Sequence, residues 1–299
     1  MKTLAAVKEK VKREKRQVAA VANAADEKVL QAVKVALEEE LCGFLLFGNQ
    51  KDIATMAKNI NLDIFAPEIS IEHTETADES ALEAVKSVHS NKAQILMKGN
   101  LSTKELMKPA LSKEYGLRTG KVLSHVALFE IPNQEKLYFL TDSGMIISPT
   151  IDEKVEIIKN AVKIAQAVGI QTPKVAVLAA VESVNPAMEA TLDAAALTVM
   201  QKRGQIKECL VDGPLAFDNA ISIKAAIHKK IESEVAGNAD ILLVPSIETG
   251  NALYKSFVYF AGAKVAGIIS GAKAPIVVTS RADAAEDKLY SLTLALISA

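Results

Sequence analysis

Short apolar runs and helical patterns alternate along most of the chain. An apolar run at residues 18–22 precedes a helical pattern at 26–39, and a run at 43–48 precedes one at 51–59. Further strands are predicted at residues 93–97, 122–129, 137–141, 174–181, 208–211, 241–244 and 275–279. Because parallel strands need crossover helices to connect them, this alternation predicts an α/β fold with mainly parallel sheets.

A strong helix signal divides the pattern into two halves. Residues 152–168 are amphipathic and end at Gly169, with Pro173 shortly beyond, as helix stop signals require. The chain has 299 residues, a length that suits two domains. We predict a first αβα domain made of residues 1–147 and 280–299, and a second αβα domain made of residues 148–279.

The composition is that of a globular protein with little net charge. Apolar residues make up 49% of the chain, and 35 Lys and Arg oppose 36 Asp and Glu, for a formal net charge of −1. This balance argues against a general binder of nucleic acid. Cys42 and Cys209 are far apart and show no Cys/His spacing, so neither a disulfide framework nor a zinc site is expected.

The N-terminal segment lacks the apolar stretch of a secretory signal, and no later apolar run reaches the roughly 18 residues that span a bilayer. We therefore expect a cytoplasmic protein that does not enter membranes. Leu4, Val7 and Val11 lie on one face of a helical pattern crowded by lysines and arginines. This segment is either a basic arm or, as we favour, a packed surface helix, because Glu9 and Glu14 dilute its charge.

Polar, turn-forming loops follow four predicted strands of the second half, at residues 182–186, 212–219, 245–251 and 279–283. Ligands of open α/β sheets bind outside the carboxyl ends of the strands, where helix N-termini offer free N–H groups. These loops are therefore candidate binding segments. Turns and helix caps also require Ser, Asp and Gly for purely structural reasons, so the pattern alone does not decide between the two.

The last loop carries the most specific pattern. Asp283, with Glu286 three residues later, forms a capping-box pattern that predicts the start of a C-terminal helix. Ser280 and Arg281 would then precede a helix N-terminus, where an anion meets free N–H groups and a guanidinium. Asp287 follows Ser280 by seven residues, close to two helical turns, where a carboxylate could act as a general acid or base. On spacing alone, an ordinary helix cap with a solvated Asp explains the pattern at least as well.

Other candidate motifs are weak. Tyr254 and Lys255 could reach a ligand from the helix predicted after residue 251, or could lie on the surface. The four histidines are scattered without metal-ligand spacing, so each is more simply a surface or core residue. The sequence has no GxGxxG motif for a Rossmann cofactor site, no P-loop for nucleotide hydrolysis and no GxSxG motif for the nucleophile elbow of a hydrolase. These three functions therefore have no support in the sequence.

Several segments together resemble a known family. Residues 238–289, which include NADILLVPSIETG and VTSRADAAEDKL, resemble the carboxyl half of phosphate acyltransferases of the phosphotransacetylase and phosphotransbutyrylase family. VAVLAAVESVNPAM (175–188), LVDGPLAFDNAIS (210–222) and LRTGKVLSHVALFE (117–130) are similar to the butyryltransferase branch. Because these segments agree in order, the resemblance covers most of the chain.

The resemblance implies an acyltransferase that moves a short acyl group, butyryl or a branched C4–C5 group, from coenzyme A to inorganic phosphate. Acyl-CoA and phosphate would give acyl phosphate and free CoA, with no permanently bound cofactor and no metal. Ser280, Arg281 and Asp287 match the family's catalytic residues. The resemblance gives Asp287 the role of base for the CoA thiol, Arg281 that of phosphate binding, and Ser280 a hydrogen bond to the carbonyl oxygen or the sulfur.

Further substrate-binding residues are expected in the loops and in the first domain. The candidates are Glu248, Thr249, Gly250, Asn251, Lys255, Asp212, Gly213, Lys108 and Arg118. One position departs from the family pattern, because relatives commonly carry Asn where this chain has Ile146.

The family also implies a homodimer of two-domain subunits, with the site in the interdomain cleft, as in isocitrate and isopropylmalate dehydrogenases. Two other classes remain open. One is a metal- and NAD-dependent hydroxyacid dehydrogenase on a related fold, and the other is a non-catalytic module that binds nucleic acid through the basic N-terminal arm. Acyl-chain preference cannot be predicted, because one methylene in a pocket discriminates by only about 1 to 3 kcal/mol.

Overall fold

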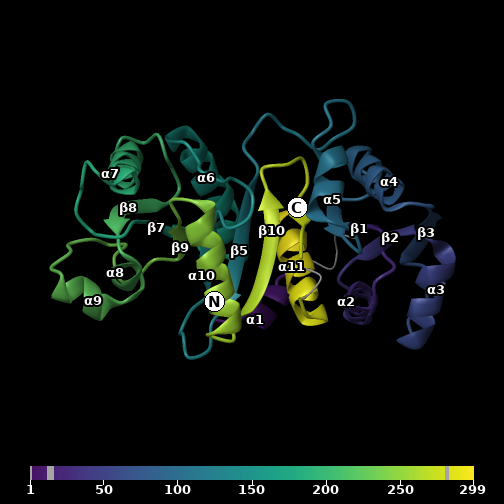
Figure 1. The fold of residues 1–299 in the computed structure, drawn as a ribbon. Coiled ribbons are helices and arrows are strands. Elements are labelled where there is room, and N and C mark those ends of the chain that lie inside the picture. The colour runs from purple at the N-terminus through teal and green to yellow at the C-terminus, as the bar shows by residue number, and fades with distance from the viewer. Residues whose placement is uncertain (1, 12–16, 280–282) are drawn as a thin grey trace. The chain divides into compact units, whose positions relative to one another are not determined.

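The computed structural model describes residues 2–11, 17–279 and 283–299 (Figure 1). The chain folds into two compact units. Unit 1 is formed by Val122–Val265 with the extreme N-terminus, and unit 2 by Ala5–Lys121 and Ala266–Ala299. These borders differ from the predicted domain boundaries at residues 147/148 and 279/280, and the predicted domains remain a prediction.

Unit 2 is built on a mostly parallel sheet with the strand order β3-β2-β1-β4-β11-β10. Its strands are β1 (Val18–Ala22), β2 (Gly43–Gly48), β3 (Ile69–His73), β4 (Ile95–Lys98), β10 (Lys264–Ser270) and β11 (Ile276–Val277). All pair in parallel except β10, which runs antiparallel to β11. The strand predicted at residues 275–279 is the short β11, which pairs with β4.

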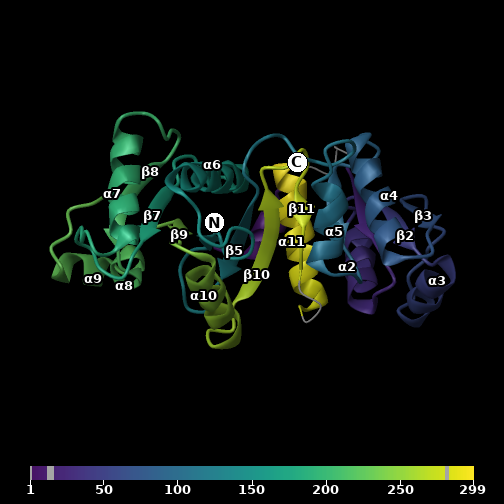
Figure 2. The same ribbon diagram turned by 45° about the horizontal axis from the view of Figure 1, so that its top comes forward.

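The helices of unit 2 confirm the predicted alternation of strands and helices. They are α2 (Glu27–Glu38), α3 (Gln50–Asn59), α4 (Ala77–His89), α5 (Thr103–Ala110) and α11 (Ala285–Ser298). Residues 19–22 of β1 are completely buried, as expected for a parallel strand covered on both faces. α11 packs against α2, and the two helices lie side by side in Figure 2.

Unit 1 contains the strand order β5-β6-β9-β7-β8. Its strands are β5 (Ser124–Glu130), β6 (Tyr138–Thr141), β7 (Lys174–Leu178), β8 (Leu210–Leu215) and β9 (Ile241–Leu243). β5 and β6 are antiparallel, whereas β6, β9, β7 and β8 pair in parallel. The helices are α6 (Ile151–Val168), α7 (Glu189–Lys202), α8 (Phe217–Ile221), α9 (Ile223–His228) and α10 (Ile247–Tyr259).

The long helix α6 ends where the sequence predicted. Thr150 and Glu153 form a capping box at its start, and Gly169 adopts a left-handed conformation with φ of 110° at its end. In the core of unit 1, the ring of Phe129 meets Tyr254 and Phe257 edge-on, with ring centroids 5.2 Å apart in both pairs. This aromatic contact fixes α10 on β5.

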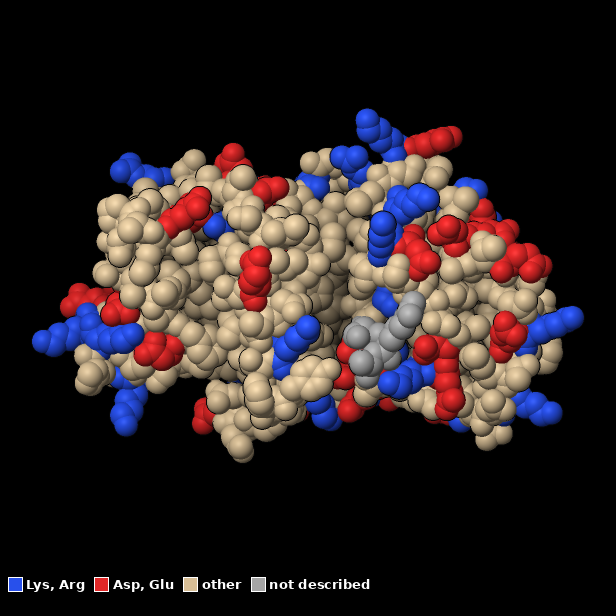
Figure 3. Space-filling view, viewed as in Figure 1, with Lys and Arg blue, Asp and Glu red and all other residues tan. Residues whose placement is uncertain are grey.

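The N-terminal segment forms the short helix α1 (Leu4–Lys8). Its predicted apolar stripe, Leu4, Val7 and Val11, is buried, and Lys8 forms a 2.5 Å ion pair with Glu39. This confirms the packed helix over residues 4–8. Over the face shown in Figure 3, acidic and basic side chains are intermixed, as the balanced charge predicts. No helix in the described part of the chain is long and apolar enough to cross a membrane.

Candidate active site

One of the three predicted catalytic residues, Asp287, lies in the described part of the chain, at the start of α11 in unit 2. Ser280 and Arg281 fall outside the described residues. Asp287 is described and occupies the first turn of α11, with a half-buried side chain. A carboxylate in this turn is favoured by the positive end of the helix dipole.

The start of α11 differs from the predicted capping box. The N-cap residue is Ala284, which makes no side-chain cap bond, so Asp283 lies one residue too early for that role. Ala284 still has extended backbone angles (φ −66°, ψ 159°), and the helix begins only at Ala285. Glu286 accepts a 2.9 Å hydrogen bond from the hydroxyl of Tyr290, one turn further along.

The carboxyl ends of β1, β4 and β11 meet at one edge of the unit 2 sheet, because these strands are parallel neighbours. Lys98, the last residue of β4, is 4% exposed, and its Nζ donates to the carbonyl oxygens of Gly99 (3.3 Å) and Leu101 (3.1 Å). A Cβ at Gly99 would lie 2.2 Å from the carbonyl oxygen of Asn23. The chain after β4 therefore approaches the chain after β1 at a distance that only glycine permits.

A second buried lysine, Lys288, lies at the same edge. It is 3% exposed, and its Nζ donates to Oγ1 of Thr279, two residues beyond β11, at 3.2 Å. Burial lowers the pKa of Lys288, while the carboxylates of Asp283, Asp26 and Asp287 oppose that shift. Sequence reasoning missed this residue, although a lysine in the first turn of a helix, directly after a candidate base, opposes the helix dipole and was a usable signal.

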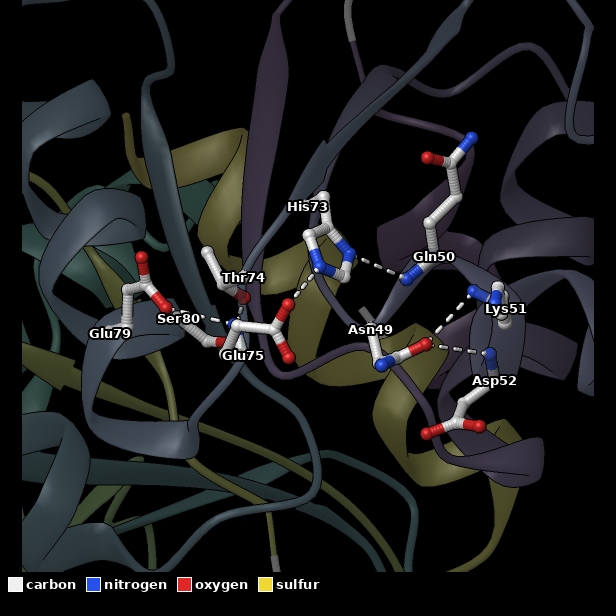
Figure 4. A network of polar contacts seen from close by, with 9 residues as sticks. All are labelled: Asn49, Gln50, Lys51, Asp52, His73, Thr74, Glu75, Glu79 and Ser80. Carbon is white, nitrogen blue, oxygen red and sulfur yellow. Dashed lines mark hydrogen bonds and ion pairs between the residues drawn. The ribbon is translucent and has the colours of Figure 1, made fainter.

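A separate polar network lies at the carboxyl ends of β2 and β3 (Figure 4). Nδ1 of His73 accepts from the backbone N–H of Gln50 at 3.2 Å, and Nε2 lies 2.8 Å from Oε1 of Glu75. This arrangement requires the tautomer with hydrogen on Nε2. Asn49 caps α3 by accepting from the backbone N–H groups of Lys51 and Asp52. His73 is thus a satisfied surface residue, in line with the simpler sequence interpretation.

In unit 1, the turn after β6 is organised by Asp142. Its carboxylate accepts hydrogen bonds from the backbone N–H groups of Gly144 (2.8 Å), Met145 (2.9 Å) and Ile146 (3.3 Å). Burial raises the pKa of Asp142, and these hydrogen bonds act against that rise. Ile146, the position at which the sequence departs from the expected family pattern, contributes to this turn through its backbone N–H, which donates to Asp142.

His125 in β5 faces the same turn. Its Nδ1 lies 2.9 Å from Oγ of Ser143, and its ring centroid is 6.1 Å from that of Tyr254. Burial lowers the pKa of His125 to about 4, so the imidazole is neutral at neutral pH. The sequence predicted no more than a surface or core histidine, because its neighbours come from segments far along the chain.

The predicted binding segment after β9 forms the first turns of α10. It contains Glu248, Thr249, Gly250, Asn251 and, one turn on, Lys255. A Cβ at Gly250 would lie 2.6 Å from the carbonyl oxygen of Asp142 and 2.8 Å from Cα of Ser143. The structure therefore brings this helix start against the Asp142 turn.

Asp212 and Gly213 lie elsewhere than the sequence predicted. Both are inside β8, where Asp212 pairs with Ala176, rather than in a loop beyond residue 211. The Asp-Gly-Pro sequence is typical of a turn, but β8 is an edge strand, where proline is tolerated, and it continues to Leu215. The prediction of a loop at these two residues is wrong, and their binding role remains a prediction.

The two candidates from the first half of the chain have exposed side chains. Lys108 lies in α5, and Arg118 lies in the segment after it. Cys42 and Cys209 are free and buried. Within the described residues, no group of three or more His, Cys, Asp or Glu side chains is arranged to hold a metal ion.

Comparison with known proteins agrees with the sequence resemblance. A family model described as "Phosphate acetyl/butaryl transferase" matches residues 70–296. A "probable phosphate butyryltransferase" of Bacillus subtilis is 55% identical, over 94% of this chain and 93% of its own. A phosphate butyryltransferase of Clostridium acetobutylicum is 46% identical, over 97% and 96% of the two chains.

Among solved structures, a branched-chain phosphotransacylase from Enterococcus faecalis aligns with a TM-score of 0.82 and 38% identity, covering 94% of this chain and 98% of that one. These matches define an enzyme of the acyltransferase type. The chain belongs to the phosphate acetyl/butyryltransferase family, which confirms the resemblance seen in the sequence.

Proposed function

We propose that this protein transfers a short acyl group, butyryl or a branched C4–C5 group, between coenzyme A and inorganic phosphate: acyl-CoA + phosphate = acyl phosphate + CoA. The observation that carries this proposal is family membership across nearly the whole chain, including the segment that contains Asp287. Acyl-CoA and phosphate are substrates in this scheme, and no permanently bound cofactor takes part.

We assign the chemistry to Ser280, Arg281 and Asp287. In the direction that consumes acyl phosphate, the carboxylate of Asp287 takes the proton of the CoA thiol, whose pKa as a free thiol is about 8.5. Arg281 binds phosphate through two parallel hydrogen bonds, and Ser280 donates to the carbonyl oxygen or the sulfur. The position of Asp287 in the first turn of α11 supports this assignment.

The start of α10 is our candidate for further substrate contacts. Glu248, Thr249, Gly250 and Asn251 lie in its first two turns, and Gly250 touches the Asp142 turn. A helix start next to a tightly turned loop is a common place for binding polar ligands.

The proposal also includes the two predicted αβα domains, with a cleft as in isocitrate and isopropylmalate dehydrogenases, and a cytoplasmic location. A crystal structure with CoA bound would test the cleft.

We further propose that the protein is a homodimer that uses α7. Met188, Leu192 and Val199 are exposed along one side of this helix, while Ala194 and Leu197 are buried on the other. A helix that is apolar on both sides is typical of a buried helix, and a second copy would cover it. Leu192→Glu should convert the protein to a monomer in sedimentation velocity; an unchanged dimer would exclude this face.

The central experiment measures release of free thiol from acetyl-, butyryl-, isobutyryl- and isovaleryl-CoA, with and without phosphate. The proposal predicts release that requires phosphate and is fastest for at least one C4 or C5 substrate. Thiol release that does not depend on phosphate would indicate a hydrolase instead. No release from any substrate in the series would remove the proposal and favour the dehydrogenase alternative.

A further inference from the structure

The first turn of α11 holds a cation in a place that physical chemistry disfavours. Lys288 is the fourth residue of the helix and is 3% exposed. The positive end of the helix dipole repels an ammonium there, and removing a charge from water is costly unless it is compensated. We therefore expect neighbouring groups to compensate the charge of Lys288.

The surroundings of Lys288 tie three elements together. Its Nζ donates to the hydroxyl of Thr279, which follows β11, at 3.2 Å. Its charge interacts favourably with Asp283, with Asp26 and with Asp287 of its own helix, and unfavourably with Lys28. Asp26 is the N-cap of α2, the helix that packs against α11. The cation thus connects the start of α11, the start of α2 and the end of β11.

The N-cap residue of α11 offers no side-chain oxygen to the first turn. This residue is Ala284, so the orphan N–H groups of the first turn gain no bond from that side chain. In α2, by contrast, the side chain of Asp26 accepts from the N–H of Val29 at 2.9 Å. The contact of Lys288 with Thr279 therefore ties the first turn of α11 to the end of β11 at a helix start whose N-cap side chain makes no bond.

We propose that Lys288 is a positioning residue for acyl transfer, which anchors the first turn of α11 to the end of β11 and thereby fixes the carboxylate of Asp287. This inference rests on the proposed role of Asp287 as the base. Asp287 precedes Lys288 directly, so a shift of the anchored backbone moves the carboxylate with it. Proton transfer requires close contact between base and thiol, and small displacements of reacting groups are costly.

A second buried lysine provides a matched control. Lys154 is also the fourth residue of its helix, α6, and is 5% exposed. It binds the carboxylate of Asp193 at 2.5 Å, in unit 1. Both lysines therefore pose the same problem of burial near a helix start, but only Lys288 follows a proposed catalytic residue.

The test measures steady-state kinetics with phosphate and butyryl-CoA for four variants: Lys288→Met, Lys288→Arg, Thr279→Val and Lys154→Met. Circular dichroism first verifies that each variant is folded. We expect Lys288→Met to lower kcat about 10- to 100-fold while KM for both substrates changes less than threefold. Lys288→Arg should restore most of kcat, and Thr279→Val should lower it by roughly three- to tenfold, since it removes one anchor bond. Lys154→Met should lose thermal stability and keep its kcat.

The pH profile adds a measurement that a purely structural role would not change. The pKa of Lys288 is lowered, so its charge is lost as pH rises through that value, and kcat of the native protein should fall there. Among the residues that the structure describes, the charged groups around it are Asp283, Asp26, Lys28 and Asp287, with Lys98 buried at the end of the neighbouring β4. Lys288→Arg should move this alkaline limb to higher pH, because a guanidinium stays charged.

Several results would overturn the inference. A folded Lys288→Met with kcat within twofold of native would do so, as would a Lys154→Met that loses as much kcat as Lys288→Met. If Lys288→Met does not fold, an unchanged kcat in Thr279→Val decides against it. Asp287→Asn separates the two proposals: if it keeps native kcat, the base assignment fails, whereas an inactive Asp287→Asn beside an active Lys288→Met refutes this inference alone.

Discussion

The carboxyl edges of the two units hold their buried charges in different ways. In unit 2, the buried Lys98 donates to backbone carbonyl oxygens, and the buried Lys288 donates to the hydroxyl of Thr279, with the carboxylates of Asp283, Asp26 and Asp287 acting on its charge. In unit 1, the turn after β6 buries the carboxylate of Asp142, held by backbone N–H groups, and the neutral imidazole of His125, while the buried Lys154 is paired with the carboxylate of Asp193. Positive charge at an edge favours an anion and an ionised base, whereas unit 1 offers an organised surface without excess positive charge.

The buried cations of unit 2 bear on the proposed reaction. Phosphate is anionic and Asp287 must be ionised to act as a base, so both benefit from the cations of unit 2. The acyl thioester carries no formal charge at its reacting carbon before attack, so its binding depends less on buried cations than the binding of phosphate does. Four changes to the protein can break or sharpen this comparison.

The largest effect is expected at Asp287. Asp287→Asn keeps the shape of the side chain and removes the base, and general-base catalysis typically contributes about 100- to 10,000-fold. We expect kcat to fall at least about 100-fold, with KM for CoA changed less than threefold. Steady-state kinetics with acyl phosphate and CoA measures both, and a variant with native kcat would show that the base lies elsewhere.

A smaller effect is expected from His125 on acidification. Its pKa is about 4 in the folded protein and 6.5 as the reference value. Between these values the unfolded chain binds a proton that the folded protein does not, so stability falls as pH falls through this window. The loss from pH 7 to pH 4 should be about 2 to 3 kcal/mol.

Urea unfolding across this pH range tests that expectation. His125→Asn should remove most of the extra pH dependence, since asparagine does not titrate. The exposed His228 gives the control, because His228→Asn should leave the native curve unchanged. Parallel curves for the native protein and His125→Asn would show that His125 is not held neutral.

Gly250 tests the contact between α10 and the Asp142 turn. An added Cβ would meet backbone atoms at 2.6 and 2.8 Å, so Gly250→Ala must push the two segments apart. Overpacking of this kind costs about 1 to 3 kcal/mol, partly offset by the better helix propensity of alanine. Denaturant unfolding and KM for acyl-CoA should both be affected, whereas Ala252→Ser on the exposed side should change neither by much.

The smallest effect is expected at Ile146. Its backbone N–H serves Asp142, and its side chain is not needed for that bond. Ile146→Asn, which introduces the residue that the family resemblance implies here, should change the unfolding free energy by less than about 0.5 kcal/mol. A loss above 2 kcal/mol would mean that the isoleucine side chain, rather than the backbone, stabilises the turn.

Local signals in the sequence were enough to predict much of the fold. The helix predicted at residues 152–168 and its stop at Gly169 match α6, and the apolar runs of β1 and β2 match their strands. β3 was not predicted, because ISIEH is short and carries polar residues at its end. The start of α11 was misplaced by one residue, because alanine at the N-cap gives no signal.

The candidate site was predicted only in part, because burial depends on segments far apart in the chain. The motif around Asp287 was visible through the family resemblance. Lys288 is buried by α2 and β11, and His125 is enclosed by Ser143 and Tyr254. These surrounding segments are distant in sequence, so the residues next to Lys288 and His125 in the chain do not reveal the burial. Local patterns therefore predict which residues lie near a strand end, but not which of them lose contact with water.

The most direct test of the proposed reaction is phosphorus NMR of a mixture of butyryl-CoA, inorganic phosphate and protein, with free thiol followed in the same sample. The proposal predicts that an acyl phosphate signal and free CoA appear in equal amounts with native protein, and far more slowly with Asp287→Asn. Release of CoA without acyl phosphate, or equal rates for the two proteins, would contradict it.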